Sequence, residues 1–354
     1  MAGPGEIGEG ERKRWRELRA ASNAPRNPFM EPEFTDAVGH VRPRARVAVV
    51  YDGLEPAGFL PYERGPLGQG RAIGLGVSDA QGAILRPGLV LETGELLRAC
   101  SVSSFAFDNL EADQELFVRY AAEEHATYVI DVEKGFETYE SVLRAQSPKF
   151  LKTTLAKERR LGRQVGELRF VFDERDPAAL RTLMEWKSAQ YRRTGRRDRF
   201  AQEWISRLVA RLAQTRAPDC SGTLSVLYAG GRPVAAHFGL RSASVLACWF
   251  PAYDPDFARY SPGLVLHLRM AEAAAAGGIG MLDLGRGPAE YKDALKTGEL
   301  PVYEGAVTRP GVGTALHWLS REPARRAHSF VRSRPRLASL AARTLKGAAR
   351  LRRT

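Results

Sequence analysis

The stretch LSVLYAGGRPVAAHFG, Leu224 to Gly239, predicts two short strands around a Gly-Gly turn, and an earlier stretch of the chain repeats this layout. VAVVYDGLEPAGFLPY, Val47 to Tyr62, aligns with it without a gap and shares Val, Tyr, Gly and Pro at four positions. Glycine supplies the positive φ of a tight turn, and proline suits an edge strand. The repeat indicates either a duplicated unit or two unrelated hairpins that need the same turn chemistry.

The composition is that of a soluble globular protein. The chain has 354 residues, of which 44% are hydrophobic and 27% charged, and about 150 residues per domain is usual, so two domains are expected. No apolar run approaches the roughly 18 residues of a membrane span, and the first residues lack an apolar signal core. The three cysteines form no CxxC pair. We therefore expect a cytoplasmic protein without disulfides or a metal site.

The net charge of +12 is concentrated at the C-terminus. From Arg321 to Thr354 there are eleven Lys and Arg residues against one acid, Glu322. The near-neutral remainder argues against a nucleic-acid-binding body. The tail alternates Arg with apolar residues, which is typical of an amphipathic helix that lies on an anionic inner-membrane surface. A basic helix that only improves solubility would show the same pattern.

Strands and helices alternate, which predicts an α/β fold. In the first half, strands are expected over 71–76, 101–110 and 126–132, with a helix over 111–124. In the second half, from Glu167, the expected order is β, α, α, β, β, β, α, β, α, β. We expect a ragged N-terminus over 1–26, a first unit over 27–134, a second unit over 135–312 that opens with bridging helices at 135–165, and the basic tail over 313–354.

Five short motifs carry a family resemblance: Tyr253-Asp254, Ser261-Pro262-Gly263, Asp283-Leu284-Gly285, Tyr291-Lys292 and Tyr303-Glu304-Gly305. With the element order, they resemble the GNAT acyltransferases of the cellulose and exopolysaccharide biosynthesis (CelD-like) branch, which are similar to the Fem aminoacyltransferases. The resemblance is good over Gly135 to Arg309 and weaker over Asn27 to Val132. It implies tandem GNAT-like units, each a mixed, mostly antiparallel central sheet flanked by helices. The repeated hairpin would be the central antiparallel pair of each unit.

The resemblance implies that the diphosphate of an acyl-CoA, such as acetyl-CoA, binds at a helix N-terminus, where free N–H groups and the helix dipole favour an anion. The residues expected there are Arg259, Tyr260, Ser261, Gly263 and Leu264. The sequence departs from the usual superfamily loop, because Pro262 replaces the first glycine and Leu264 replaces a small residue. An ordinary Ser-capped helix that starts with proline would look the same.

Acyl transfer needs a nucleophile that loses a proton and an acid for the leaving thiolate. The resemblance places Tyr291 as the acid, although a tyrosine that only packs the short helix fits too. Asp283 lies on an apolar strand, as a base or as a structural partner of Arg286. His237 and Glu185 are the other base candidates. His237 also fits a packed core histidine, and an amine that arrives deprotonated needs no base.

The acceptor side is predicted from basic and aromatic residues. The loop YRRTGRRDRF has five arginines between Arg192 and Arg199, and arginine forks bind phosphate bidentately. Arg192, Arg196, Tyr253 and Lys292 are the candidates for acceptor binding, and a solvated loop is the alternative.

Three functions remain open. The first is acyl transfer from acyl-CoA to an amine or hydroxyl of a sugar or nucleotide sugar, in polysaccharide or cell-envelope biosynthesis. The second is Fem-like transfer from aminoacyl-tRNA, which the near-neutral body and the missing long helical hairpin disfavour. The third is a catalytically degenerate GNAT pair that serves as a binding or scaffold subunit, which the departures at Pro262 and Leu264 suggest.

Overall fold

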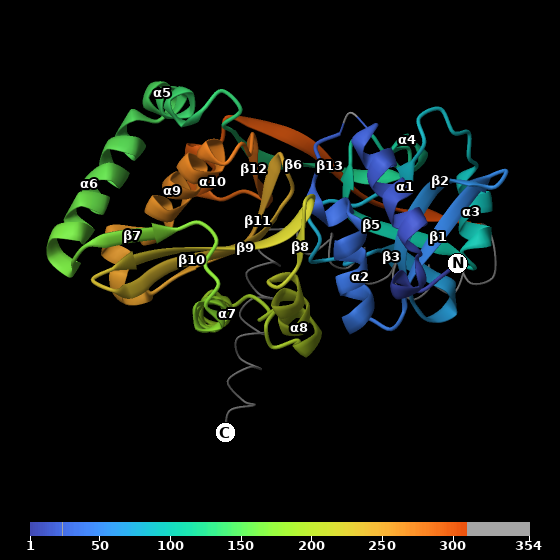
Figure 1. The fold of residues 1–354 in the computed structure, drawn as a ribbon, viewed down its shortest axis with the longest axis horizontal. Coiled ribbons are helices and arrows are strands. Elements are labelled where there is room, and N and C mark those ends of the chain that lie inside the picture. Colours follow the sequence, from blue (N-terminus) through green and yellow to red (C-terminus); the bar gives the residue numbers. More distant parts are fainter. Residues whose placement is uncertain (23, 310–354) are drawn as a thin grey trace, which may run out of the picture.

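The computed structural model describes residues 1–22 and 24–309. A single sheet of 13 strands runs through this part of the chain (Figure 1). The main strand order is β1-β2-β3-β5-β13-β6-β12-β11-β10-β9-β7, with β4 paired to β2 and β8 paired to β9. The basic tail expected over 313–354 lies outside the described residues.

The strands are β1 (Ala45–Asp52), β2 (Glu55–Arg64), β3 (Gln69–Ala72), β4 (Ile84–Leu85), β5 (Ser104–Glu111), β6 (Ala121–Asp131), β7 (Leu168–Val171), β8 (Arg216–Ala217), β9 (Cys220–Ala229), β10 (Arg232–Arg241), β11 (Val245–Tyr253), β12 (Met281–Arg286) and β13 (Gly298–Thr308). The α-helices are α1 (Glu9–Ala20), α2 (Pro32–Val41), α3 (Thr93–Ala99), α4 (Glu115–Val118), α5 (Phe136–Gln146), α6 (Pro148–Val165), α7 (Pro177–Arg193), α8 (Glu203–Leu212), α9 (Pro262–Ala276) and α10 (Glu290–Leu295). Short 3-10 helices are η1 (Pro4–Glu6), η2 (Pro28–Met30), η3 (Pro66–Gly68) and η4 (Pro255–Tyr260).

The two halves of the sheet repeat one arrangement of strands. In each half an antiparallel hairpin, β1–β2 or β9–β10, is followed by a third antiparallel strand, β3 or β11. The third strand then pairs in parallel with the fourth, β5 or β12. The repeated sequence stretches therefore form equivalent hairpins. The second hairpin is internal to the sheet as expected, whereas β1 of the first lies at the edge.

The halves exchange one strand each. Strand β13 comes last in the described chain but pairs with β5 of the first half, whereas β6 comes from the first half and pairs with β12 of the second. The two exchanged strands also pair with each other, from Gly298 opposite Val129 to Gly305 opposite Ala121. Figure 1 shows β13 crossing from the second half into the first. Each half is therefore completed by a strand from the other.

The helices form two layers in the second half, with α9 and α10 on one face of the sheet and α7 and α8 on the other (Figure 1). One hydrophobic core belongs to both halves, since it joins Trp15 and Phe34 of the first half to Leu183, Ile205 and Trp249 of the second. The aromatic rings of Phe29 and Trp249 meet edge to face at 5.1 Å. The two halves therefore share a hydrophobic core, and they are not two separate cores joined only by a connecting segment.

The N-terminal residues differ from the sequence-based expectation of a ragged start. They form η1 and α1, and Trp15 of α1 is 1% exposed and stacks on Phe59 at 4.9 Å. The Trp15 indole N–H donates to the Met30 carbonyl (3.0 Å). The polar, charged sequence of this segment hides a short apolar face, with Trp15 and Leu18 three residues apart on one side of the helix.

The helix expected over 111–124 is also wrong. Only Glu115–Val118 is helical, and the chain then enters β6 at Ala121, earlier than the expected 126. Long-range pairing explains the difference, since residues 121–125 provide the backbone partners of β13. Helices α5 and α6 do occupy the segment expected to bridge the halves.

A buried ion cluster joins α1, η2 and β5. Glu31 is 0% exposed and its Oε1 lies 3.8 Å from Arg19 Nε, while Glu111 Oε2 lies 3.4 Å from an Arg19 terminal nitrogen. Desolvation raises the pKa of both carboxyls to about 7, and the Arg19 charge opposes this only in part. Both carboxyls therefore hold their protons near pH 6, where unfolded glutamates are ionised.

This proton uptake predicts a pH dependence of stability. Between about pH 4.5 and pH 7 the folded chain binds more protons at Glu31 and Glu111 than the unfolded chain does, so these groups lower the unfolding free energy as pH rises. We expect a Glu31→Gln variant to gain stability relative to wild type as pH rises from 5 to 8. Urea unfolding at four pH values measures this, and a constant difference between the two proteins would contradict it.

Candidate active site

The parallel strands β11 and β12 part in the middle of the sheet. They pair only over Val245–Ala247 and Met281–Asp283, although β11 continues to Tyr253 and β12 to Arg286. Helix α7 lies on one side of this break, and α9 and α10 lie on the other (Figure 1). Side chains from both helix layers can therefore reach the same point.

Helix α9 begins beside the end of β11, because a Cβ at Gly263 would lie 3.6 Å from Tyr253 Cδ1. Ser261, which precedes the helix, adopts a left-handed conformation (φ 48°) that is uncommon for a residue with a side chain. Lys157 of α6 donates from Nζ to Ser261 Oγ (2.8 Å). The Lys157 ammonium group and the positive end of the helix dipole thus lie at the same place. Together they favour binding of an anion at the start of α9.

The other residues expected at this helix start are nearby but differ in exposure. Arg259 is exposed and its guanidinium lies over the Tyr260 ring at 4.7 Å. Tyr260 is 1% exposed and donates its hydroxyl hydrogen to Gln164 Oε1 (2.9 Å). Leu264 is half-buried in the first turn. Arg259, Ser261 and Gly263 are therefore more accessible than Tyr260, whose position is structural.

Asp283 is buried where the strands part and is held by residues of both halves. Its carboxylate accepts hydrogen bonds from the Thr127 hydroxyl of β6, from the Gly285 N–H (2.9 Å) and from the Asn27 amide (3.3 Å). Burial raises its pKa, and these hydrogen bonds oppose the rise. Arg286, the alternative partner expected from sequence, pairs instead with Glu304 (2.6 Å).

Lys292 of α10 binds the backbone at the end of β12. Its Nζ donates to the carbonyls of Gly285 (2.9 Å) and Arg286 (3.2 Å), and burial lowers its pKa. Asp79, from the loop after β3, lies against the same backbone, since a Cβ on Gly285 would be 3.3 Å from its Oδ2. Desolvation, reinforced by Asp283, raises the pKa of Asp79 to about 7. No hydrogen bond engages the Asp79 side chain in the described part of the chain.

Lys187 reaches the break from α7. Its Nζ donates to the Pro251 carbonyl of β11 (2.8 Å). Burial, with the charges of Arg196, Arg199 and Lys292, lowers its pKa to about 8. Lys292 thus acts on both Asp79 and Asp283 at the end of β12, and its charge also lowers the pKa of Lys187.

His237, His267 and Tyr291 form a line of rings from β10 to α10. The ring centroids are 6.2 Å apart between the histidines and 5.3 Å between His267 and Tyr291. His237 is 0% exposed, its Nε2 accepts a hydrogen bond from the Trp249 N–H (3.1 Å), and burial holds its pKa well below the usual value. Burial raises the pKa of Tyr291 to about 12. Tyr291 therefore keeps its proton, and His237 stays neutral with one nitrogen occupied.

The remaining sequence-predicted residues lie further out. Glu185 is exposed on α7. Arg192 is exposed and pairs with Asp198 (3.2 Å), and it also donates to Ser188 (2.8 Å). Arg196 is exposed on the loop between α7 and α8, where its charge influences Lys187. Asp283 and Lys292 thus both bind the backbone of Gly285, and Tyr291 adjoins Lys292 on α10. No hydrogen bond or ion pair joins Glu185 to them in the described residues.

Lys187, Lys157 and Asp79 were not among the catalytic or binding residues predicted from the sequence. Lys187 continues the buried face of α7 after Leu180 and Leu183, so a lysine at an apolar helical position was the available signal. Lys157 was one of several basic residues on α6. Asp79 follows a Gly-rich loop, and its sequence neighbours fit an ordinary turn. Only the fold shows that this loop meets β12.

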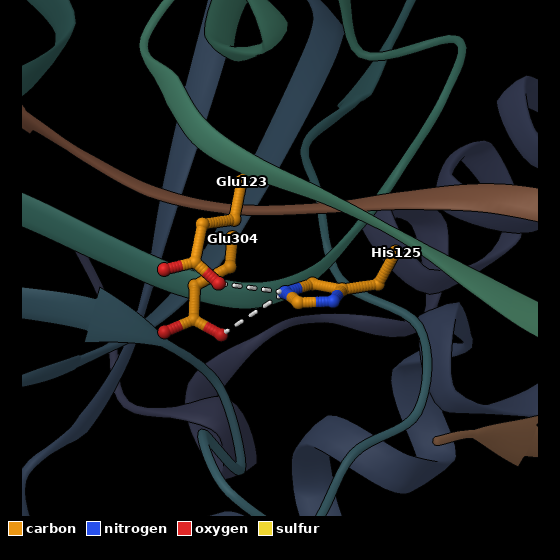
Figure 2. Close-up of side chains that lie close together, drawn as sticks. All are labelled: Glu123, His125 and Glu304. Atoms are coloured by element: carbon orange, nitrogen blue, oxygen red, sulfur yellow. Dashed lines mark ion pairs between the residues drawn. The ribbon is translucent and has the colours of Figure 1, made fainter. Parts of the chain in front are cut away.

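One group of side chains in the described residues brings three possible metal ligands within 4.8 Å of one another, namely Glu123, His125 and Glu304 (Figure 2). His125 Nε2 lies 3.3 Å from Glu123 Oε2 and 3.7 Å from Glu304 Oε2. The same Glu304 oxygen is 2.6 Å from the Arg286 guanidinium. A cation already neutralises this oxygen, so we assign no metal to the group, and the expectation of no metal stays a prediction.

Comparison with protein families gives the second half of the chain an identity. The family model described as an acetyltransferase (GNAT) domain matches residues 149–293. This stretch is similar to the acetyltransferase (GNAT) domain family, and we refer to it as the GNAT domain. It contains the break between β11 and β12, the start of α9, Lys187 and Tyr291, and the expectation of a GNAT-type acyltransferase is confirmed at this level. No curated protein sequence matches the chain.

Solved structures share the fold over most of the chain. FemX has a TM-score of 0.58 and 11% identity, with 87% of this chain and 98% of that chain covered. L-PGS from Bacillus licheniformis has a TM-score of 0.54 and 12% identity, with 91% and 98% covered. The C-terminal domain of a putative lysylphosphatidylglycerol synthetase from Agrobacterium fabrum has a TM-score of 0.53 and 14% identity, with 87% and 94% covered. These similarities concern the fold alone.

Membrane association was expected only for the tail. In the described part of the chain, no helix combines the length and apolar character that crossing a membrane requires.

Gly285 provides a test of the geometry at the end of β12. Its φ of +76° and its proximity to Asp79 require glycine. We expect Gly285→Ala to destabilise the fold by about 1–2 kcal/mol in urea unfolding. Gly94 is the matched control, because it is helical with open space around its Cα, so Gly94→Ala should stabilise by about 0.5–1 kcal/mol. Unchanged stability of Gly285→Ala would contradict this geometry.

Proposed function

We propose that the chain transfers an acyl group, in the first instance acetyl, from acyl-CoA to an amine or hydroxyl of a sugar or nucleotide sugar. The place of this reaction is polysaccharide or cell-envelope biosynthesis, as in the CelD-like branch that the sequence resembles. The observation that carries the proposal is the contact of Lys157 with Ser261 at the start of α9, inside the GNAT domain.

The acyl-CoA diphosphate would lie at the start of α9. Lys157 and the exposed Arg259 supply two positive charges there, and the first turn of the helix supplies backbone N–H groups. Pro262 removes one of these donors, so the side-chain cations matter more than in a glycine-rich loop. The thioester would extend from the helix start toward the break between β11 and β12.

Tyr291 is our candidate for the acid that protonates the leaving thiolate. Its raised pKa keeps the phenol protonated at neutral pH, and α10 places it beside the break. Lys292 holds the backbone of β12 next to it.

Asp79 is our candidate for the base. Its carboxylate is unpartnered, lies against Gly285 and titrates near neutral pH, where a general base is most effective. Asp283 is already held by three hydrogen bonds, and His237 uses Nε2 to accept from Trp249. Glu185 is exposed on α7, which leaves it a weaker candidate.

Aminoacyl transfer is the second candidate function. The observation in its favour is the fold that the chain shares with FemX and with a protein named as a lysylphosphatidylglycerol synthetase. An aminoacyl ester is attacked by an amine as a thioester is, so the same acid and base would serve. An activity assay with acetyl-CoA or aminoacyl-tRNA as the donor separates the two functions. If the protein turns over neither donor, the result favours the scaffold alternative.

Donor binding is tested by calorimetric titration with acetyl-CoA. We expect saturable binding that weakens about tenfold in Lys157→Ala, because a charge-assisted contact to phosphate is lost. Lys149→Ala on the exposed start of the same helix is the matched control and should bind normally. Gly263→Trp should block the helix start. Absence of binding to any CoA thioester would overturn the proposed donor.

Catalysis is tested by the pH dependence of kcat/KM for acetyl transfer. The rate should rise with pH up to about 7, because Asp79 must lose its proton to act as base. We expect Asp79→Asn to lose about 100-fold or more and Tyr291→Phe about 100-fold. Glu55→Gln, a carboxyl exposed in the first hairpin turn, should match wild type. A wild-type rate and pH profile in Asp79→Asn would assign the base elsewhere.

A further inference from the structure

A pocket of about 820 Å³ lies in the first half, outside the GNAT domain. Strands β3, β5 and β13 and the end of β2 line it, together with residues 42–44, which directly precede β1. These strands lie together on the first-half side of the exchanged pair (Figure 1). The pocket is therefore built by the half that the donor site does not use.

One wall of the pocket is basic. Arg44 and Arg64 line it, and both are exposed. The Arg64 N–H at the end of β2 donates to the carbonyl of Arg44 (3.0 Å), which directly precedes β1, so the two residues are neighbours. Within residues 1–22 and 24–309 neither guanidinium makes a hydrogen bond or an ion pair. Arg42 and Arg71 also line the pocket, and both pair with the single carboxylate of Glu63.

Arg71 strengthens this wall. Its Nε is shielded from solvent and has no hydrogen-bond partner. Its side chain as a whole is 41% exposed, and Glu63 pairs with only one of the two terminal nitrogens, so an anion in the pocket can approach the other. Grouped guanidinium forks match the oxygens of a phosphate better than those of a neutral hydroxyl.

The opposite wall is acidic. Asp108 and Glu304 line it, and Glu304 adjoins Glu123 and His125 on β6 (Figure 2). Arg286 pairs with Glu304 and its charge also acts on Asp108, which accepts hydrogen bonds from the Gln81 amide (2.6 Å) and from the Gly76 backbone. The pocket thus has a positive end and an end that suits a positively charged or hydrogen-bond-donating group.

The acidic end is next to the proposed base. Gln81 donates from Nε2 both to Asp108 Oδ1 (2.6 Å) and to the hydroxyl of Ser78 (3.0 Å), the residue before Asp79, so Asp108 lies beside the segment that carries Asp79. Asp79 in turn lies against Gly285, where β11 and β12 have parted. A ligand in the pocket would therefore present its Asp108 end to the point where the thioester is expected.

We propose that this pocket binds the acceptor and that the acceptor is a primary amine that also carries a phosphate group. The phosphate contacts Arg44, Arg64 and Arg71, and the amine lies at Asp108 beside Asp79. The amine nitrogen forms a bond to the thioester carbonyl carbon and its proton passes to Asp79. The carbon–sulfur bond breaks, and the thiolate leaves with the proton of Tyr291. This inference rests on the proposed function and selects N-acylation over O-acylation.

Three small probes test the two ends of the pocket. Glucosamine 6-phosphate has both groups, glucosamine lacks the phosphate, and glucose 6-phosphate lacks the amine. In calorimetric titration of the full chain we expect glucosamine 6-phosphate to bind at least tenfold more tightly than either of the other two. Equal affinity for glucosamine and glucosamine 6-phosphate would overturn the phosphate end, and equal affinity for the two phosphates would overturn the amine end.

Variants locate the binding site. The double variant Arg44→Ser and Arg64→Ser should weaken glucosamine 6-phosphate about tenfold or more and leave glucosamine unchanged. The matched control removes two exposed arginines outside the pocket, Arg98→Ser and Arg207→Ser, and should keep wild-type affinity. If the pocket variant and the control variant bind glucosamine 6-phosphate with equal affinity, the assignment of the acceptor to this pocket is wrong.

Donor and acceptor failures are distinguishable. Acetyl-CoA affinity should be the same in the pocket variant as in wild type, because its residues lie outside the GNAT domain. If acetyl-CoA binds, but the affinity for the two sugar phosphates is the same with and without Arg44 and Arg64, the pocket assignment fails and the proposed function stands. If acetyl-CoA does not bind at all, the proposed function fails.

Discussion

The structure depends on one buried carboxylate. Asp283 lies on β12 at the position where β11 leaves it, and burying an ionised group there is costly unless its oxygens are bound. Thr127 from the exchanged strand, the backbone of Gly285 and Asn27 near the N-terminus provide those bonds. Three segments far apart in the sequence must therefore meet before this carboxylate is satisfied. Their meeting fixes the end of β12 and, with it, the surroundings of Lys292, Tyr291 and Asp79.

Strand exchange makes the two halves one functional body. The first half supplies β6 to the second, where it pairs with β12, and the second half supplies β13 to the first, where it pairs with β5. Separating the halves would therefore break the sheet of both. The same exchange brings the loop that carries Asp79 against a strand of the GNAT domain. In our proposals the second half binds the donor, the first half binds the acceptor, and the reaction occurs where they join.

Burial gives the site its chemistry. Burial disfavours the charged forms of both Asp79 and Lys187. It therefore raises the pKa of the carboxyl to about 7 and lowers the pKa of the ammonium to about 8, so that both groups titrate near neutral pH. Hydrogen bonds decide which buried groups remain available. Asp283 and His237 already accept hydrogen bonds, whereas no hydrogen bond engages Asp79 within residues 1–22 and 24–309. This difference, rather than residue type, distinguishes the candidates.

Local sequence determined the elements of the second half. Helix α9 begins at Pro262 as expected because a serine and a proline signal a helix start, and the hairpins at Gly53 and Gly230 follow from the positive φ that glycine permits. The motifs around Ser261, Asp283 and Tyr291 were sufficient to indicate a GNAT domain. Only the tertiary structure decided the exchange of β6 and β13, the packing of α1 through Trp15, and the approach of Asp79 to Gly285 at the end of β12. Helix and turn signals lie within a few neighbouring residues, whereas strand pairing and the burial of charge depend on residues that the chain brings together only when it folds.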